Sequence, residues 1–124
     1  MSSSPEKLLI VGSNPRNQEL LVEFVAKLGY TTLRADTLEM LDTLLDDAPQ
    51  AAFALVDITG FGNAIWSRCA RLHEMDIPLL LIAPRQSLAL KQLGFAHGAQ
   101  TILQKPVGMK DLADTIRGLL HPKV

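Results

Sequence analysis

The stretch Phe53-Ala54-Leu55-Val56-Asp57 decides the fold, because an apolar run ends abruptly at a single carboxylate. The turn-forming stretch Ile58-Thr59-Gly60-Phe61-Gly62 follows it. A short apolar run bounded by turn formers is typical of a strand buried on both faces of a parallel sheet. Asp57 then stands at the carboxyl end of the strand, the edge where open α/β sheets bind ligands. The alternative is that Asp57 only opens a turn or caps the next helix.

The composition is that of a single globular domain. The chain has 124 residues, of which 48% are hydrophobic and 20% charged, and its formal net charge is −1. Its 12 Lys and Arg residues are spread along the chain, so we expect no direct nucleic-acid binding and no membrane attachment. The apolar stretch at residues 77–84 is far shorter than the roughly twenty residues that span a bilayer. The start lacks signal-peptide features and Cys69 is the only cysteine, which favours a cytoplasmic, disulfide-free protein.

Strand and helix signals alternate along the chain. Apolar runs predict strands at Lys7–Val11, Thr31–Ala35, Phe53–Asp57, 77–83 and 101–104. Apolar residues at helical spacing predict helices at 18–28, from 38 to the Asp46-Asp47-Ala48-Pro49 stretch, and at 63–75, 88–97 and Met109–Leu120. Ser13 or Asn14 is expected to cap the first helix, and Asp36 or Thr37 the second.

This alternation predicts an α/β fold, a three-layer α/β/α sandwich around a five-stranded parallel sheet. Each parallel connection needs a crossover, and crossovers are right-handed, so helices cover both faces of the sheet. At this length the natural candidate is the flavodoxin-like strand order 2-1-3-4-5. In that order the first and third strands are neighbours. The loop after Val11 is therefore expected beside Asp57, with the ends of the fourth and fifth strands next to them.

Four stretches, taken together, resemble a known family. They are Leu8-Leu9-Ile10-Val11 before an Asn-Pro turn, Ala54-Leu55-Val56-Asp57-Ile58, Ile77-Pro78-Leu79-Leu80-Leu81-Ile82-Ala83, and His97-Gly98-Ala99-Gln100-Thr101-Ile102-Leu103-Gln104-Lys105-Pro106-Val107. In this order they resemble the CheY-like receiver domain of bacterial two-component response regulators. The resemblance implies one receiver-like domain over residues 1–124, with its core at about 7–120.

The resemblance assigns roles to two charged residues. Asp57 matches the aspartate that accepts a phosphoryl group from a sensor kinase histidine, and Lys105 matches the lysine that pairs with the phosphoryl oxygens. The bond between Lys105 and Pro106 is expected to be cis, a state that only about 5% of X-Pro bonds adopt. The resemblance also implies protein partners, a sensor histidine kinase or an output domain. The contact face would be the fourth helix, fifth strand and fifth helix, which also allows a homodimer.

The chain departs from the family where the metal would bind. Gly12 and Ser13 stand in place of the acidic pair that helps to hold Mg²⁺, with the neutral Asn14 behind them. Thr59 matches a position that offers only a backbone carbonyl. Because Mg²⁺ prefers carboxylate oxygens, Asp57 and one carbonyl predict weak Mg²⁺ binding at best, and no cofactor.

The two switch positions of the family are also changed. Ala83 stands where a Thr or Ser hydroxyl reports phosphorylation, and it has no donor to move. Ile102 stands where an aromatic ring swings inward, and a β-branched side chain has one preferred rotamer. The chain therefore resembles degenerate "pseudo" receivers, which use the fold for protein contacts and are not enzymes.

Several alternatives stay open. Without the acidic pair, Asp57 and Lys105 can form a direct, purely structural ion pair. A conventional receiver phosphorylated on Asp57 is the alternative function. A phosphate- or nucleotide-binding enzyme on the same fold is more remote, because Gly12-Ser13-Asn14 offers backbone amides to an anion but matches no phosphate-loop spacing.

The remaining candidates carry weaker signals. The histidines at 73, 97 and 121 are expected to be isolated from one another and from Cys69, so no zinc site is expected. Trp66 and Phe61 are either an exposed partner contact or packed under the Asp57 loop.

Overall fold

The apolar runs form five parallel strands, each followed by a helix. The computed structural model describes residues 7–47, 49–85 and 87–120. Within these ranges the elements are β1 (Lys7–Val11), α1 (Pro15–Lys27), β2 (Thr31–Ala35), α2 (Leu38–Asp46), β3 (Phe53–Asp57), a short 3-10 helix η1 (Gly62–Ala64), α3 (Ile65–Glu74), β4 (Leu79–Ala83), α4 (Leu88–Ala96), β5 (Ala99–Gln104) and α5 (Met109–Leu120).

The strand order is β2-β1-β3-β4-β5, which confirms the predicted topology. The register pairs Val11 with Val56, Asp57 with Ile82, and Ala83 with Gln104. The strands therefore end at a common edge. Backbone hydrogen bonds continue one residue further, from Gly12 N to the carbonyl oxygen of Ala35 at 3.2 Å and from Lys105 N to that of Ala83 at 2.9 Å. These bonds fix the backbone of the two loops beside Asp57.

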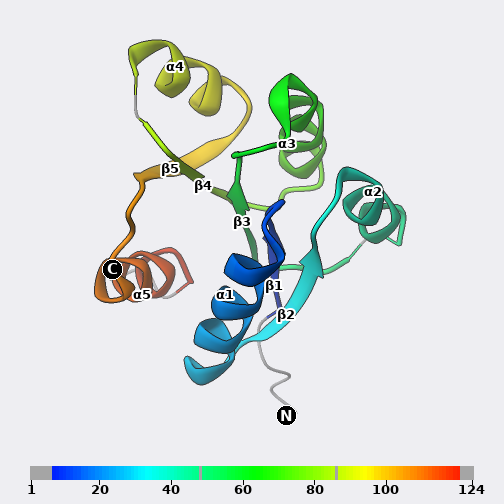
Figure 1. Ribbon diagram of the computed structural model, residues 1–124. Helices are drawn as coiled ribbons and strands as arrows, with labels where there is room; N and C mark the ends of the chain where they lie inside the picture. The colour runs from blue at the N-terminus through cyan, green and yellow to red at the C-terminus, as the bar shows by residue number, and fades with distance from the viewer. Residues whose placement is uncertain (1–6, 48, 86, 121–124) are drawn as a thin grey trace.

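Two hydrophobic clusters fill the layers on either side of the sheet, because successive strand residues point to opposite faces. Figure 1 shows α1 and α5 covering one face and α2, α3 and α4 the other. The cluster under α1 and α5 contains Leu8, Ile10, Val25, Phe53, Leu55, Leu80, Ile82, Leu112 and Ile116. The opposite cluster includes Leu9, Val11, Val56, Leu81, and residues of α2 and α3. The predicted three-layer sandwich is thus confirmed.

Several predicted boundaries were wrong for local reasons. The first helix begins at Pro15, not at residue 18, because its first turn is polar and escapes a hydrophobic pattern. The third helix, predicted as one segment over 63–75, is split into η1 and α3. The fourth strand begins at Leu79, after Pro78, and the fifth begins two residues early at Ala99, where the ladder with β4 is irregular.

Side chains cap the helices as the sequence suggested. Of the two candidates for the first helix, Asn14 is the cap, because its side chain accepts a hydrogen bond from Asn17 N at 3.0 Å. Of the two for the second, Thr37 is the cap and accepts from Met40 N at 3.0 Å. Asp36 instead pairs with Arg34 at 2.7 Å.

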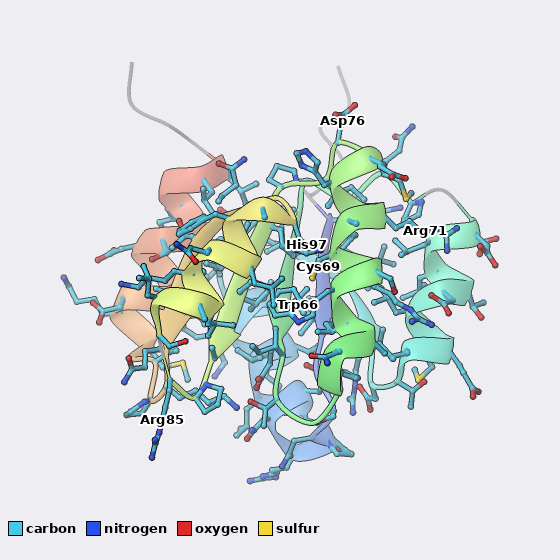
Figure 2. The ribbon with its side chains drawn as sticks, turned by 90° about the horizontal axis from the view of Figure 1, so that it is seen from above. Trp66, Cys69, Arg71, Asp76, Arg85 and His97 are labelled. Atoms are coloured by element: carbon cyan, nitrogen blue, oxygen red, sulfur yellow. The ribbon has the colours of Figure 1, made fainter. Side chains whose placement is uncertain are left out.

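The helices α3 and α4 lie side by side over the sheet. Figure 2 shows Trp66 and Cys69 on α3, with His97 beside them at the end of α4. The Trp66 and His97 ring centroids are 5.6 Å apart. Trp66 and Phe61 are both half-buried against the core, which favours packing over a free contact surface. In the described ranges, none of the helices combines the length and apolar character of a bilayer span.

Candidate functional site

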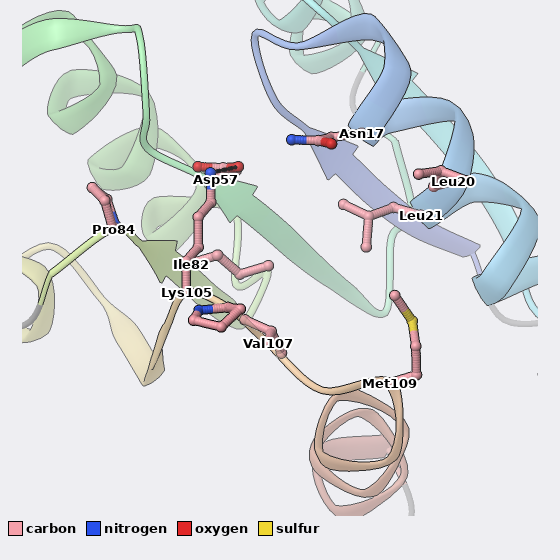
Figure 3. A pocket seen from close by; sticks show the side chains of 10 residues that line it. Asn17, Leu20, Leu21, Asp57, Ile82, Pro84, Lys105, Val107 and Met109 are labelled. Atoms are coloured by element: carbon pink, nitrogen blue, oxygen red, sulfur yellow. Dashed lines mark ion pairs between the residues drawn. The ribbon is translucent and has the colours of Figure 1, made fainter.

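Asp57 and Lys105 form a direct ion pair at the carboxyl edge of the sheet. Lys105 Nζ lies 2.7 Å from Asp57 Oδ2, and Figure 3 shows both side chains at one end of a pocket. The Asp57 side chain is 11% exposed and that of Lys105 31%. The direct pair considered from the sequence is therefore present. The bond between Lys105 and Pro106 is cis, as the resemblance implied.

Hydrogen bonds join this pair to two neighbouring loops. The second oxygen of Asp57, Oδ1, accepts a hydrogen bond from Thr59 N at 3.0 Å, and Lys105 Nζ also donates to Thr59 Oγ1 at 3.2 Å. The Ser13 hydroxyl donates to the carbonyl oxygen of Thr59 at 2.7 Å. Gly60 has a φ of +88°, and a Cβ atom there would collide with Ser13 Oγ. Direct hydrogen bonds and one ion pair thus join the loops after β1, β3 and β5.

The arrangement does not fit Mg²⁺. A hard cation of this kind needs several oxygen ligands, usually including carboxylates. Asp57 is the one carboxylate of the loops described above, and both of its oxygens are already engaged, by Lys105 and by Thr59 N. The Thr59 carbonyl accepts from Ser13. Across the described residues, no three His, Cys, Asp or Glu side chains are grouped so that they could hold a metal.

Gln18 is a site residue that the sequence analysis missed. It is 1% exposed, and Gln18 and Asp57 are the two buried polar or charged residues of the described part of the chain. Its Nε2 lies 3.0 Å from the carbonyl oxygens of both Ile10 and Ala35. A signal was present: residues 18, 21, 25 and 28 share one helical face, so Gln18 is a polar residue at an inward position.

Of the two positions that the resemblance assigns to a switch, Ala83 lies at this edge and Ile102 lies two residues before the end of β5. Ala83 ends β4 fully buried. Ile102 is 8% exposed and lies under Gly94 of α4, where an added Cβ atom would stand 2.9 Å from Ile102 Cδ1 and 3.0 Å from Leu81 Cδ1. Helix α4 therefore packs on β5 at the close distance that a glycine permits.

A pocket of about 550 Å³ opens beside the ion pair, between α1 and the segment that leads into α5 (Figure 3). Its walls are mainly apolar, and its lining residues are Asn17, Leu20, Leu21, Asp57, Ile82, Pro84, Lys105, Pro106, Val107 and Met109. Leu20 and Met109 are 44% and 52% exposed, although both belong to helices with buried faces. The Asp57 carboxylate is therefore reachable from solvent through this pocket.

The histidines and the cysteine contribute nothing to this edge. His73 lies against Gly98, where an added Cβ atom would stand 2.7 Å from His73 Nδ1. Cys69 is buried on the inner face of α3, and burial raises the pKa of its thiol to about 12. The prediction for His121 lies outside the described residues.

No protein-family model matches the chain, but individual proteins do. It is 28% identical over 118 residues to the response regulator MprA of Mycolicibacterium vanbaalenii, which covers 94% of this chain and 51% of that protein. MprA of Mycobacterium avium is 28% identical over 116 residues, with 93% and 51% covered. The chain thus spans about half the length of the curated relatives that it matches.

Solved structures agree on the fold. A two-component response regulator from Clostridium difficile superposes with a TM-score of 0.84 at 17% identity, covering 94% of this chain and 97% of the other. The chemotaxis protein CheY4 of Vibrio cholerae superposes with a TM-score of 0.81 at 20% identity, covering 94% and 100%. These structures show that the chain has the CheY-like fold, and the sequence relatives that it resembles are response regulators.

Proposed function

We propose that this chain is an atypical receiver domain that takes part in two-component signalling through protein–protein contact, without Mg²⁺. The observation that carries the proposal is the Asp57–Lys105 pair, which is electrically neutral and has both carboxylate oxygens engaged. A conventional acceptor site needs a carboxylate that is free to bind a cation and a phosphoryl group. Here that carboxylate joins the end of β3 to the loops that carry Thr59 and Lys105.

The proposed contact face is formed by α4, β5 and α5. Helix α4 exposes three large apolar side chains, Leu88 at 73%, Leu93 at 38% and Phe95 at 51%. Its buried residue is Gly94, which lies on Ile102 of β5. Exposed aromatic and aliphatic residues that cluster on one element are typical of protein interfaces. The partner would be a sensor histidine kinase or an output domain, and a homodimer through this face would use the same residues.

We further propose that residues 1–124 act as one receiver-like domain in the cytoplasm, with a regulatory and not a catalytic role. In this view Asp57 and Lys105 occupy the phosphoacceptor and lysine positions but serve mainly as structure. Ala83 and Ile102 then transmit no switch, because neither has a hydroxyl or ring to relocate. The relatives, which are response regulators, support the regulatory part of this proposal.

The test is an amide NMR titration of the purified domain with Mg²⁺, followed by Mg²⁺ with beryllium fluoride, which mimics a phosphoryl group on aspartate. We expect no saturable shifts at Asp57, Thr59 and Lys105 at millimolar metal. The matched control is Asp57→Asn, which should give the same silent titration.

One observation favours a second function, a conventional receiver phosphorylated on Asp57: the carboxylate lines an open pocket and is not sealed from solvent. That function predicts saturable shifts in the same titration, spreading from Asp57 toward Ile102 and absent in Asp57→Asn. Such a result would refute the metal-free proposal.

A further inference from the structure

Gln18 reaches from α1 into the space directly behind the loop after β1. Its carboxamide is held on the sheet by its Nε2 group, which lies 3.0 Å from the carbonyl oxygens of Ile10 and Ala35 and 3.3 Å from Asp36 Oδ1. The side chain is 1% exposed, so its loss would take a donor away from two buried backbone carbonyls. Gln18 is therefore a fixed side chain and not a flexible one.

A residue larger than glycine at position 12 would collide with this side chain. A Cβ atom on Gly12 would lie 2.7 Å from Gln18 Oε1, 3.1 Å from Gln18 Cδ and 3.6 Å from Asp57 Cβ. Gly12 is not among the glycines with positive φ, so its backbone does not demand glycine. Its N–H is also bonded to the Ala35 carbonyl, which limits any retreat of the loop. The buried carboxamide of Gln18 therefore occupies the space that a side chain at position 12 would need.

We propose that Gln18 is the residue that closes this edge to divalent cations, because its neutral carboxamide fills the space that any side chain at position 12 would need. Two elements thus exclude an acidic side chain at position 12: the β1–α1 loop, which has glycine there, and the inner face of α1, which carries Gln18. Acidic residues restored at positions 12 and 13 would not make a cation site while Gln18 remains. This inference deepens the proposed metal-free function and rests on it only for the biological meaning of the closed site.

The first test needs no metal. Urea unfolding in EDTA is measured for Gly12→Ala, Gln18→Ala and the double variant. We expect Gly12→Ala alone to raise the unfolding equilibrium constant about tenfold, which is about 1.4 kcal/mol. In the Gln18→Ala background the same change should raise it less than about threefold, because the colliding carboxamide is gone. The matched control is Gly118→Ala on α5, where an added Cβ would meet nothing within 4 Å.

If the effects of Gly12→Ala and Gln18→Ala on the unfolding equilibrium constant simply multiply in the double variant, the two residues do not compete for the same space and the inference is wrong. The Gly118→Ala control should leave the unfolding constant unchanged or lower it, since alanine is the better helix former. A loss of stability in that control as large as in Gly12→Ala would likewise overturn the steric explanation. Alanine variants are used because they make the smallest change that still places a Cβ atom.

The second test adds Mg²⁺ to Gly12→Asp/Ser13→Asp, with Gln18 kept and with Gln18→Ala. We expect the melting temperature to rise with millimolar Mg²⁺ only in the variant that lacks the carboxamide. A rise in both variants, or in neither, would refute the role assigned to Gln18. If the acidic variant with Gln18 does not fold, the unfolding of Gly12→Ala, Gln18→Ala and their double variant decides whether Gln18 has this role.

The two proposals can fail separately. Saturable Mg²⁺ shifts in the wild-type domain would refute both the metal-free function and the closure of the edge by Gln18, whereas the alanine variants in EDTA would still report the Gly12–Gln18 collision. A silent wild-type titration combined with independent alanine effects would refute the role of Gln18 and leave the metal-free function standing.

Discussion

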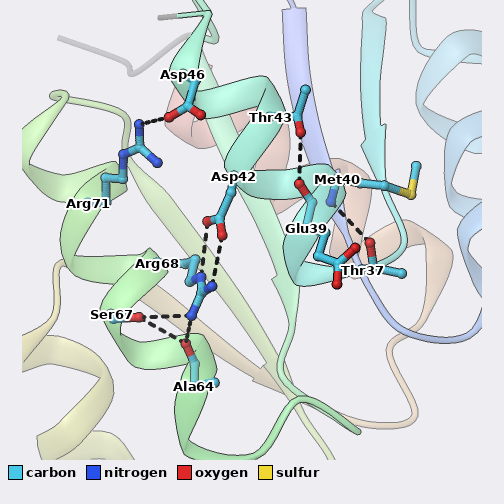
Figure 4. Close-up of polar contacts among 10 residues, drawn as sticks. All are labelled: Thr37, Glu39, Met40, Asp42, Thr43, Asp46, Ala64, Ser67, Arg68 and Arg71. Atoms are coloured by element: carbon cyan, nitrogen blue, oxygen red, sulfur yellow. Dashed lines mark hydrogen bonds and ion pairs between the residues drawn. The ribbon is translucent and has the colours of Figure 1, made fainter.

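Two ion pairs of nearly equal length lie in very different surroundings. Lys105 Nζ is 2.7 Å from Asp57 Oδ2 at the edge of the sheet, and Arg71 Nη2 is 2.6 Å from Asp46 Oδ1 between α2 and α3 (Figure 4). Asp57 is 11% exposed at its side chain, whereas Asp46 is 70% exposed. Water screens the second pair and competes for its partners. Burial, and not length, therefore decides which pair contributes to stability.

The backbone around the two acids sharpens the difference. Asp57 Oδ1 accepts a hydrogen bond from Thr59 N. Asp46 is the last residue of α2, where the helix dipole disfavours a negative charge. The Asp46 pair thus partly offsets an unfavourable position, while the Asp57 pair joins the ends of β3 and β5.

The largest effect is expected from Lys105→Met, because it leaves a nearly buried carboxylate without its cation. We expect the free energy of unfolding to fall by about 2–4 kcal/mol, measured by urea unfolding. The matched control is Lys110→Met, since Lys110 is 89% exposed and 3.4 Å from Asp114. The control should lose at most about 0.5 kcal/mol. Equal losses in the two variants would contradict the dependence on burial.

Asp57→Asn should have a smaller effect, about 1–2 kcal/mol, because the amide oxygen can still accept from Thr59 N. Lys105, at 31% exposure, can then turn toward water. Thermal melting and urea unfolding give the measurement. If this change abolishes a phosphorylation signal but leaves melting untouched, the pair is not structural.

Acid should weaken the two ion pairs of intermediate exposure, Arg34–Asp36 and Arg68–Asp42. Hydrogen bonding to the Arg34 guanidinium holds the pKa of Asp36 below its usual 3.8, and Arg68 does the same for the pKa of Asp42. A lowered pKa in the folded state adds stability above pH 3.8 and loses it as the pH falls through the folded pKa. We expect urea midpoints to drop below about pH 4. The variant Arg34→Met/Arg68→Met should show a shallower drop, and an unchanged slope would show that these pairs are not responsible.

The smallest effect is expected from Asp46→Asn, which removes the exposed pair. Its cost should be about 0–1 kcal/mol, and should shrink further in high salt. Urea unfolding at two salt concentrations provides the measurement. A loss larger than that of Asp57→Asn would reverse the ranking drawn from burial.

The sequence predicted the sheet well because strand signals depend on local apolar runs. Phe53–Asp57 and Met109–Leu120 were predicted with the observed bounds. The predicted strand order also placed Asp57 and Lys105 near each other, since parallel strands end at one edge. Gln18 was missed because hydrophobic periodicity counts apolar residues and passes over a polar residue on the same face. The ion pairs of Arg68 and Arg71 were missed because they join residues 26 and 25 positions apart on two different helices.

Because Cys69 is buried, the reactivity of its thiol reports local opening of the domain. The thiol is fully buried at the inner face of α3, with its pKa raised to about 12, so a folded molecule presents almost no thiolate to a reagent. Labelling must then wait for a fluctuation that lifts α3 from the sheet. As Cys69 is the only cysteine, the labelling rate of the unmodified chain measures how often that layer separates, with no engineered probe.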